Sequence, residues 1–360
     1  MPIFDSLLKL YAIPFKRRKS LPKDIKKILI IRLDHIGDLA LSLPAIYAIR
    51  RLYPEAEISL LVAPWSAELA SMITGIDNII VSPAPWFDRA KNPIPWHRLI
   101  KLMRRLRAER YDLGIDFRGY LYNILLMALG GVKYKLGYGV TGGGPLLEQE
   151  LDYKLGIHES EYSTEIARRL GYRGDTQFPT LKIPESPKLL DQFNLHQGFV
   201  ALNPFAGRPV KEWALQNWRR LGELVSKKFS IKPVVFGPLG RIKDSQTVDF
   251  AGGLNLIGRL SFCQWVYLLS KAEVVVSADS AAAHISSALN KPAVVIASGI
   301  EDMKRWRPLG KKVKVLWSSQ LNCVPCGRKQ GCEDMKCLKL ITPEMVIEAM
   351  GEFIPGRSTW

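Results

Sequence analysis

Short apolar segments alternate with segments of helical periodicity along this chain, and the alternation occurs in two blocks. The first block has apolar segments at 27–33, 57–62, 78–82 and 111–117, with helical patterns at 39–52, 67–73, 96–109 and 159–170. The second has apolar segments at 199–203, 232–236, 272–277 and 292–297, with helical patterns at 215–229, 260–269 and 280–289. Apolar strands separated by helices are typical of a parallel sheet covered on both faces. The pattern predicts an α/β protein with two Rossmann-like domains that face a central cleft.

Prolines mark the boundary between the two blocks. Pro179, Pro184 and Pro187 punctuate the stretch that follows the first block. The expected divisions are an N-terminal segment, a first domain, a linker, a second domain and a C-terminal helix with tail, at 1–26, 27–180, 181–197, 198–342 and 343–360. Glycines are dense between 133 and 155, which predicts an irregular loop region there.

The charge balance points to anionic partners. The chain has 360 residues, a length typical of two domains, and its formal net charge is +17. Such a charge suits nucleic acid, an anionic membrane surface or a phosphate-bearing substrate. No RNA-binding, helix-turn-helix or zinc-finger pattern is present in the sequence, so we expect no nucleic-acid partner.

The first twenty residues combine an apolar stretch with a basic run, Lys16–Lys19. This order is typical of a peripheral contact with anionic lipid, and it also fits a helix docked on its own domain with solvated cations. The basic run follows the apolar part, which is not the order of a secretory signal. No apolar stretch reaches the 18 or more residues of a membrane-spanning helix. These features favour a soluble intracellular protein.

A carboxylate stands where the first strand gives way to a helix, in IRLDHIGDLALSLPAI. Asp38 lies at the carboxyl edge of the expected sheet, where ligands bind in such folds, and it is suited to act as a general base toward a hydroxyl. A helix cap is the alternative reading. Gly37 permits close approach of a ligand or a tight turn. No GxGxxG stands in this stretch between the first strand and its helix, which disfavours a dinucleotide dehydrogenase.

Two stretches of the second block suit an anion. In VSADSAAAH, small residues open a helix after a strand, so Ser280 and Ala281 offer backbone N–H groups to a diphosphate. Asp279 is placed to accept hydrogen bonds from sugar hydroxyls, and His284 either reaches the phosphates or is a core residue. In NPFAGRPVKEW, the cations are Arg208 and Lys211.

Four cysteines lie close together near the C-terminal end, at Cys323, Cys326, Cys332 and Cys337. In an intracellular protein, this spacing predicts a structural zinc or iron site, whereas reduced thiols or an adventitious disulfide are the alternatives.

These stretches together resemble glycosyltransferase family 9, the ADP-heptose:lipopolysaccharide heptosyltransferases of Gram-negative bacteria. The resemblance rests on RLDHIGDLALSLPAI, YDLGIDFRG, NPFAGRPVKEWALQNW, VSADSAAAHISSAL and ITPEMV. Two positions depart from the family pattern: GPLGRIKDS stands where the family has glycine and then an acidic residue, and Ala281 stands where it commonly has glycine.

The resemblance implies a GT-B architecture, with the acceptor on the first domain and ADP-heptose on the second. It implies that Asp38 is the catalytic base, Lys211 contacts the donor phosphates and Asp279 contacts the heptose. The acceptor-side candidates are Gly37, Asp116 and Arg118.

The implied enzyme is an inverting transferase that acts on a lipid-linked lipopolysaccharide core in the cytoplasm, at the anionic inner face of the inner membrane. No cofactor is expected for catalysis, because the sequence lacks a DxD pair. The alternatives are another nucleotide sugar or another glycan or protein acceptor, and, in a different class, a non-catalytic binder of anionic lipid or nucleic acid.

Overall fold

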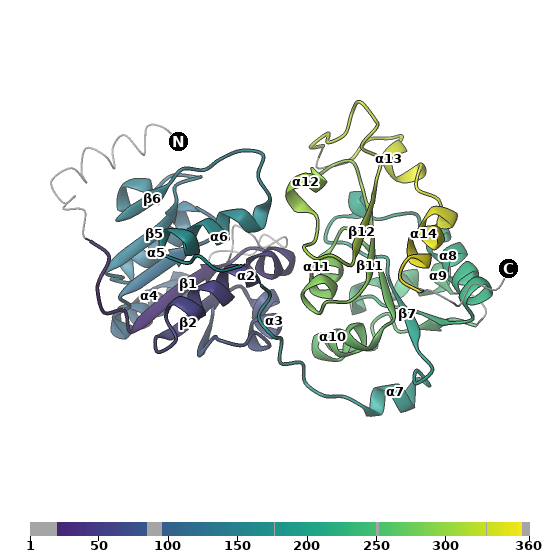
Figure 1. Ribbon diagram of the computed structural model, residues 1–360, viewed down its shortest axis with the longest axis horizontal. Coiled ribbons are helices and arrows are strands. Elements are labelled where there is room, and N and C mark those ends of the chain that lie inside the picture. The colour runs from purple at the N-terminus through teal and green to yellow at the C-terminus, as the bar shows by residue number, and fades with distance from the viewer. Residues whose placement is uncertain (1–19, 85–95, 176, 250–251, 329, 355–360) are drawn as a thin grey trace. The chain divides into compact units, whose positions relative to one another are not determined.

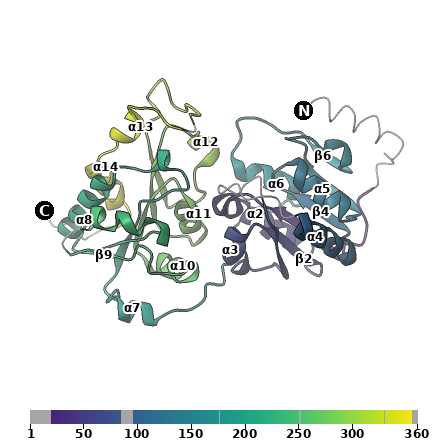
Figure 2. The same ribbon diagram turned by 180° about the vertical axis from the view of Figure 1, so that it is seen from behind.

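The protein is described by a computed structural model over residues 20–84, 96–175, 177–249, 252–328 and 330–354 (Figure 1). The chain divides into two compact units, Met1–Lys182 and Ile183–Trp360. Each unit contains one six-stranded parallel sheet, and helices cover both faces of each sheet (Figures 1 and 2). The predicted α/β architecture with two parallel sheets is confirmed.

The first sheet is built around a central strand with a continuous apolar run between two charged ends. Its strands are β1 (Lys27–Arg32), β2 (Glu57–Val62), β3 (Asn78–Val81), β4 (Leu113–Asp116), β5 (Tyr134–Tyr138) and β6 (Gln149–Leu151), in the order β3-β2-β1-β4-β5-β6. The helices are α2 (Ile36–Leu52), α3 (Ala67–Ser71), α4 (Trp96–Glu109), α5 (Leu121–Leu129) and α6 (Glu159–Arg169). Residues 28–31 of β1 are inaccessible to solvent, as a strand covered on both faces requires.

The prediction of an irregular loop region at 133–155 is wrong, because this stretch contains β5 and β6. Its glycines allow close packing of the sheet. A Cβ on Gly137 of β5 would lie 2.9 Å from the carbonyl oxygen of Asp116 on the neighbouring strand. Glycine density therefore marks close backbone approach here as well as turns.

The connection from β1 to α2 is shorter than the sequence predicts. The helix begins at Ile36, three residues before the expected start at Leu39, and it includes Asp38 in its first turn. His35 is the N-cap residue and Asp38 is at the third helical position, where the two form a reciprocal capping box. These hydrogen bonds satisfy N–H groups that a helix terminus otherwise leaves without partners.

The second sheet has the strand order of the first when it is read from its other edge. Its strands are β7 (Phe199–Asn203), β8 (Lys232–Val235), β9 (Leu254–Asn255), β10 (Val274–Ala278), β11 (Ala293–Ala297) and β12 (Val313–Trp317), in the order β12-β11-β10-β7-β8-β9. Both edge strands, β9 and β12, are absent from the sequence-based prediction. All of their residues are only partly buried, so neither strand carries a continuous apolar run that marks it.

The helices of the second unit are α7 (Lys188–Gln192), α8 (Leu215–Phe229), α9 (Ser245–Val248), α10 (Phe262–Lys271), α11 (Ala281–Ala288), α12 (Met303–Trp306), α13 (Lys336–Lys339) and α14 (Pro343–Gly351). The rings of Trp213 and Trp218 meet edge to face at the centre of the core, with their centroids 5.6 Å apart. Trp213 donates a hydrogen bond to the carbonyl of Ile341, and α14 packs against α8. The C-terminal helix thus shares the core of this unit.

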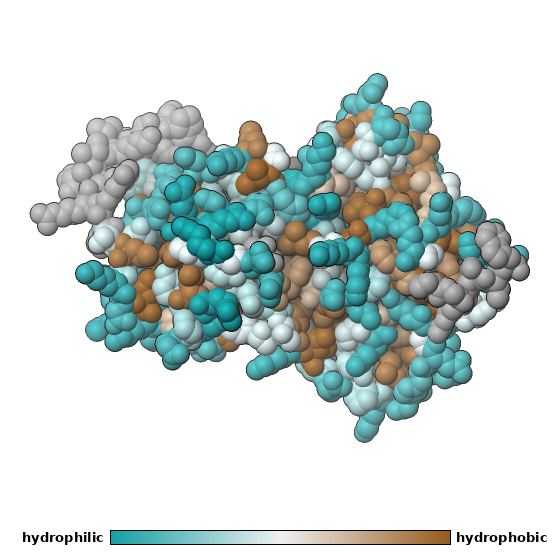
Figure 3. Space-filling model, in the orientation of Figure 1, coloured by the Kyte–Doolittle hydropathy of each residue, from teal (hydrophilic) through white to brown (hydrophobic). Residues whose placement is uncertain are grey.

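The visible surface is largely hydrophilic, with scattered apolar patches (Figure 3). The helix α4 shows how the positive charge is distributed. It buries Leu99, Leu102 and Leu106 and exposes a row of cations, Arg98, Lys101, Arg104, Arg105 and Arg107. Among the described helices, none is long and apolar enough to cross a membrane.

Candidate active site

The sequence-predicted candidates lie at the same topological position in both sheets. In each unit the strand order reverses between two adjacent strands, β1 and β4 in the first and β7 and β10 in the second. Open parallel sheets bind ligands beside the carboxyl ends of such a pair. In the first unit, Asp34, Gly37 and Asp38 follow β1, and Arg118 follows β4. In the second unit, Arg208 and Lys211 follow β7, and Asp279 follows β10.

Asp38 has one carboxylate oxygen committed to the fold and one facing cations. Its Oδ2 accepts a hydrogen bond from the backbone N–H of His35 at 3.1 Å, and its Oδ1 lies 3.7 Å from the guanidinium of Arg32. The side chain of Asp38 is 15% exposed to solvent. Burial alone would raise the pKa of Asp38, but Arg32, Arg118 and His35 together lower it below the ordinary value. Asp38 is therefore ionised at neutral pH.

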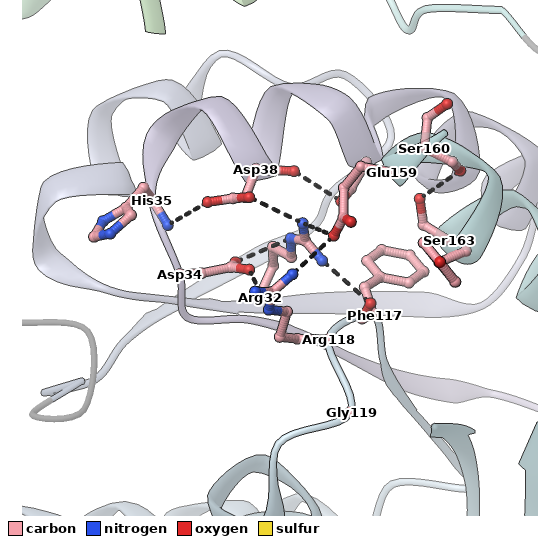
Figure 4. Close-up of polar contacts among 12 residues, drawn as sticks. Arg32, Asp34, His35, Asp38, Phe117, Arg118, Gly119, Glu159, Ser160 and Ser163 are labelled. Atoms are coloured by element: carbon pink, nitrogen blue, oxygen red, sulfur yellow. Dashed lines mark hydrogen bonds and ion pairs between the residues drawn. The ribbon is translucent and has the colours of Figure 1, made fainter. Parts of the chain in front are cut away.

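Asp38 belongs to a buried charge cluster that also contains Arg32, Asp34, Arg118 and Glu159 (Figure 4). Arg32 contacts Asp34 at 3.0 Å and Glu159 at 3.6 Å, and Arg118 contacts Glu159 at 3.0 Å and Asp34 at 3.6 Å. The side chains of Arg32, Asp34 and Glu159 are 2–3% exposed. Three carboxylates face two guanidinium groups, so the fully ionised cluster has one negative charge in excess.

Asp34 responds most strongly to this environment. Burial raises the pKa of Asp34 to about 7, with Asp38 and Glu159 acting in the same direction and the two arginines opposing it. The pKa of Arg118 is raised: burial works against its charge, but Asp34, Asp38 and Glu159 together more than offset that. The cluster thus holds one carboxylate that titrates near neutrality beside one that stays ionised.

Arg32, Asp34 and Glu159 are functional candidates that the sequence prediction missed. Charged residues at the end of an otherwise apolar strand, as in IRLD, are a signal for Arg32 and Asp34. Glu159 lies in the first turn of α6 and reaches the cluster because α6 packs against α2. The sequence shows no feature that places α6 beside α2.

Asp116 is placed where it organises a turn. Its carboxylate is inaccessible to solvent and accepts hydrogen bonds from the backbone N–H groups of Arg118, Gly119 and Tyr120 and from the side chain of Asn123. Gly119 has φ of +80°, and a Cβ there would lie 2.8 Å from the carbonyl oxygen of Tyr138. These contacts direct Arg118 into the charge cluster. The other acceptor-side candidate, Gly37, lies inside the first turn of α2.

In the second unit, the structure brings Lys211 and Asp279 together. The Nζ of Lys211 lies 2.7 Å from Oδ2 of Asp279 and 3.7 Å from Oε1 of Glu301. Arg208 pairs with the same Oε1 of Glu301. Glu301 follows β11, next to β10 in the sheet, and the sequence prediction missed it. The result is a row of alternating charges with two cations and two carboxylates.

The helix α11 begins beside Asp279. Its N-cap residue is Ser280, whose backbone is extended and whose side chain makes no capping hydrogen bond. The hydroxyl of Ser280 instead lies 3.1 Å from that of Ser277. Ala281 is the first helical residue, and His284 is buried one turn further on. An uncapped N-terminus beside two cations is suited to bind a phosphate group.

Arg241 occupies the stretch GPLGRIKDS. Its guanidinium forms two hydrogen bonds of 2.8 Å with the carboxylate of Glu212, pairs with Asp244, and stacks 4.3 Å from the ring centroid of Phe205. Burial would lower the pKa of Arg241, and the hydrogen bonds from Glu212 and Asp244 raise it. The side chain of Arg241 is therefore fixed by contacts within the second unit.

The four cysteines differ in burial. Cys323 and Cys332 are exposed, Cys326 is partly buried and Cys337 is buried in α13 within the apolar core. The Sγ of Cys332 accepts a hydrogen bond from the backbone N–H of Met335. Within the described ranges, no group of three or more His, Cys, Asp or Glu side chains is arranged to hold a metal ion. The structure therefore adds no support for the predicted zinc or iron site, which stays a prediction.

The predicted lipid-binding segment at 1–26 lies mostly outside the described residues, which begin at Ser20. Its amphipathic part and its basic run, Lys16–Lys19, are not among them.

Known proteins resemble the chain over most of its length. Lipopolysaccharide heptosyltransferase 3 of Escherichia coli K12 is 24% identical over 339 residues, which cover 89% of this chain and 95% of that protein. The structure of E. coli ADP-heptose lipopolysaccharide heptosyltransferase II matches with a TM-score of 0.74 at 22% identity, covering 91% of this chain and 98% of that one. E. coli heptosyltransferase WaaC with ADP-2-deoxy-2-fluoro heptose matches with a TM-score of 0.70 at 20% identity, covering 91% and 99%. The fold is therefore the GT-B-like fold of these structures.

The family assignment comes from a match that covers most of the chain. The model of glycosyltransferase family 9 (heptosyltransferase) matches residues 99–337. This range includes the cations after β7, the aspartate after β10 and the start of α11. The chain is a member of glycosyltransferase family 9.

Proposed function

We propose that the protein is an inverting heptosyltransferase that transfers a heptose from ADP-heptose to a hydroxyl group of a lipid-linked lipopolysaccharide core. Family membership supports the reaction class, and the names of the similar proteins support the donor and the acceptor. The observation that carries the proposal is the position of the Asp38 carboxylate, 3.7 Å from the guanidinium of Arg32 at the strand-order reversal of the first sheet.

Asp38 is the base in the proposed reaction. Its carboxylate takes the proton of the acceptor hydroxyl as the hydroxyl oxygen attacks the anomeric carbon of the heptose. The bond between that carbon and the diphosphate oxygen breaks, and its electron pair leaves with ADP. Because attack and departure occur on opposite faces of the sugar, the configuration inverts.

The second unit stabilises the departing ADP. Lys211 and Arg208 supply positive charge, and the N–H groups at the start of α11, at Ser280 and Ala281, supply hydrogen-bond donors. Asp279 is placed to accept hydrogen bonds from heptose hydroxyls, and its contact with Lys211 holds both side chains in position. His284, one turn into the same helix, is assigned to the donor side as well.

The proposed acceptor is acidic and lipid-linked, so it favours an enzyme with a basic surface close to a membrane. A lipopolysaccharide core intermediate carries acidic groups on a lipid anchor, and this chain carries a net charge of +17 with a row of exposed cations on α4. We place the enzyme in the cytoplasm, peripheral to the inner face of the inner membrane, with the segment at 1–26 as a lipid contact.

A nucleotide panel tests the donor assignment. Thermal unfolding of the purified protein is measured with ADP, UDP, GDP, NAD and ADP-heptose. A ligand at a hundred times its Kd adds about 2.7 kcal/mol to the free energy of unfolding, which raises Tm measurably. We expect stabilisation by ADP and ADP-heptose, followed by transfer to a lipid-linked core acceptor. Stabilisation by UDP or GDP alone would replace the donor, and no response would favour a non-catalytic binder of anionic lipid.

A further inference from the structure

Glu301 lies beside the two cationic side chains of the second unit, Arg208 and Lys211. It follows β11, and its Oε1 pairs with Arg208 while lying 3.7 Å from the Nζ of Lys211. The order of charges is Asp279, Lys211, Glu301, Arg208, so that each cation lies between or beside carboxylates. With both pairs ionised, this row of four side chains has no net charge.

The two carboxylates differ in how they are held. Asp279 is 5% exposed and follows β10 directly, and its contact with Lys211 measures 2.7 Å. Glu301 is 24% exposed, it reaches Lys211 only at 3.7 Å, and its partner Arg208 is 33% exposed. Glu301 is therefore the carboxylate that can turn toward solvent at the smaller cost of desolvation and packing.

A diphosphate and Glu301 require the same donors. Phosphate oxygens and a carboxylate both bind a guanidinium group through charge-assisted hydrogen bonds. If a diphosphate contacts Arg208 and Lys211 while Glu301 stays in place, like charges are brought together inside a partly buried site. A nucleotide diphosphate must therefore displace Glu301 from Arg208.

We propose that Glu301 is an internal counter-charge: it pairs with Arg208 and Lys211 in the donor-free enzyme, yields them to the diphosphate of the donor, and takes them back as ADP leaves. The inference rests on the proposed function, which assigns Arg208 and Lys211 to the donor. Glu301 acts through these two cations and touches no reacting atom, so it is a positioning residue. Its return lowers the affinity for ADP and assists product release.

The test is the affinity of the full-length protein for ADP, measured by calorimetry, in wild type, E301Q and a matched control. Because E301Q removes the competing charge and keeps the side-chain size, we expect ADP to bind about tenfold more tightly. Adenosine, which has no phosphate, should bind with unchanged affinity. The control E344Q removes the same charge from the same unit at an exposed side chain of α14 and should leave the Kd of ADP unchanged.

The outcomes separate this inference from the proposed function. If wild type binds ADP and E301Q binds it equally or more weakly, Glu301 is no competitor of the diphosphate and the inference is overturned alone. A parallel change in adenosine affinity would show a structural effect and would also overturn it. If wild type fails to bind ADP but binds UDP or GDP, the donor assignment fails, and the same comparison with that nucleotide decides the role of Glu301. Failure to bind any of the three overturns both.

Discussion

The two units use the same sheet edge for different electrostatic tasks. Both sheets share one strand order, and both place charged side chains where that order reverses. In the first unit three carboxylates face two arginines, and most of these groups are buried. In the second unit the charges balance, and Arg208 and Glu301 are partly exposed. An excess of buried carboxylate suits a proton acceptor, whereas cations with displaceable partners suit an anionic ligand.

The length of the first strand-to-helix connection explains part of this difference. In the first unit only residues 33–35 separate β1 from α2, so Asp34 and Asp38 are held against the sheet. In the second unit residues 204–214 separate β7 from α8, and this longer loop carries Arg208 and Lys211. After the short connection Asp34 is 3% exposed, whereas Arg208 on the long one is 33% exposed.

The largest expected effect comes from removing the base. D38N keeps an oxygen that can accept the hydrogen bond from His35 but abolishes the charge. We expect kcat to fall about 10³-fold, within the usual range for a general base, with the Kd of ADP unchanged because the proposed donor residues belong to the other unit. The measurement is transfer from ADP-heptose together with calorimetric ADP binding. Retention of kcat would remove Asp38 from the mechanism.

The next largest expected effect comes from removing Arg32, and it tests whether this residue stabilises the buried charge cluster. In R32M, the buried carboxylates of Asp34 and Glu159 lose a cationic partner. We expect the first unit to lose about 3 kcal/mol of stability, which hydrogen exchange should report as faster exchange in β1 and α2 than in β7 and α8. R219M, at an exposed pair on α8, should cost less than about 1 kcal/mol. Equal effects of the two variants would refute the comparison.

The third test addresses the cations of the second unit. K211Q leaves the buried carboxylate of Asp279 without its partner and removes a charge from the proposed diphosphate site. We expect ADP to bind about 30-fold more weakly, equivalent to about 2 kcal/mol. The matched control is K227Q, at an exposed position on α8. Unaltered ADP binding by K211Q would show that the diphosphate binds elsewhere.

The last expected effect is a dependence of the free energy of unfolding on pH, caused by Asp34 in the first unit. Because burial raises the pKa of Asp34 to about 7, the folded state binds more protons than the unfolded state between about pH 4 and pH 7. The contribution of Asp34 to stability is therefore present at low pH and is lost as the pH rises through 7. We expect D34N to abolish this loss, because the amide does not titrate in this pH range.

Unfolding of wild type and D34N across this pH range measures the effect, with D24N at an exposed position as the control. A difference between wild type and D34N that is independent of pH would show that Asp34 is ionised throughout.

The sequence predicts positions along the chain better than contacts across it. The apolar strands of both units are predicted because they are continuous and buried, and Asp38, Lys211 and Asp279 follow from their places after those strands. Glu159 and Glu301 were missed because their partners lie far away along the chain, and strand order is not contained in a periodicity. The cysteines show the converse, since close spacing in sequence does not by itself form a metal-binding group among the described residues.

The shared strand order also has a consequence for how the chain reaches its folded state. The central strand of each sheet pairs with a strand far along the chain, as Ile28 does with Leu113 and Val200 with Val274. Such pairing closes a long loop before it gains its contacts, which slows folding. During synthesis, the apolar strand β1 therefore waits for β4 to emerge before one of its edges is covered. A ribosome-bound chain that ends before β4 should be protected by chaperones rather than by its own sheet.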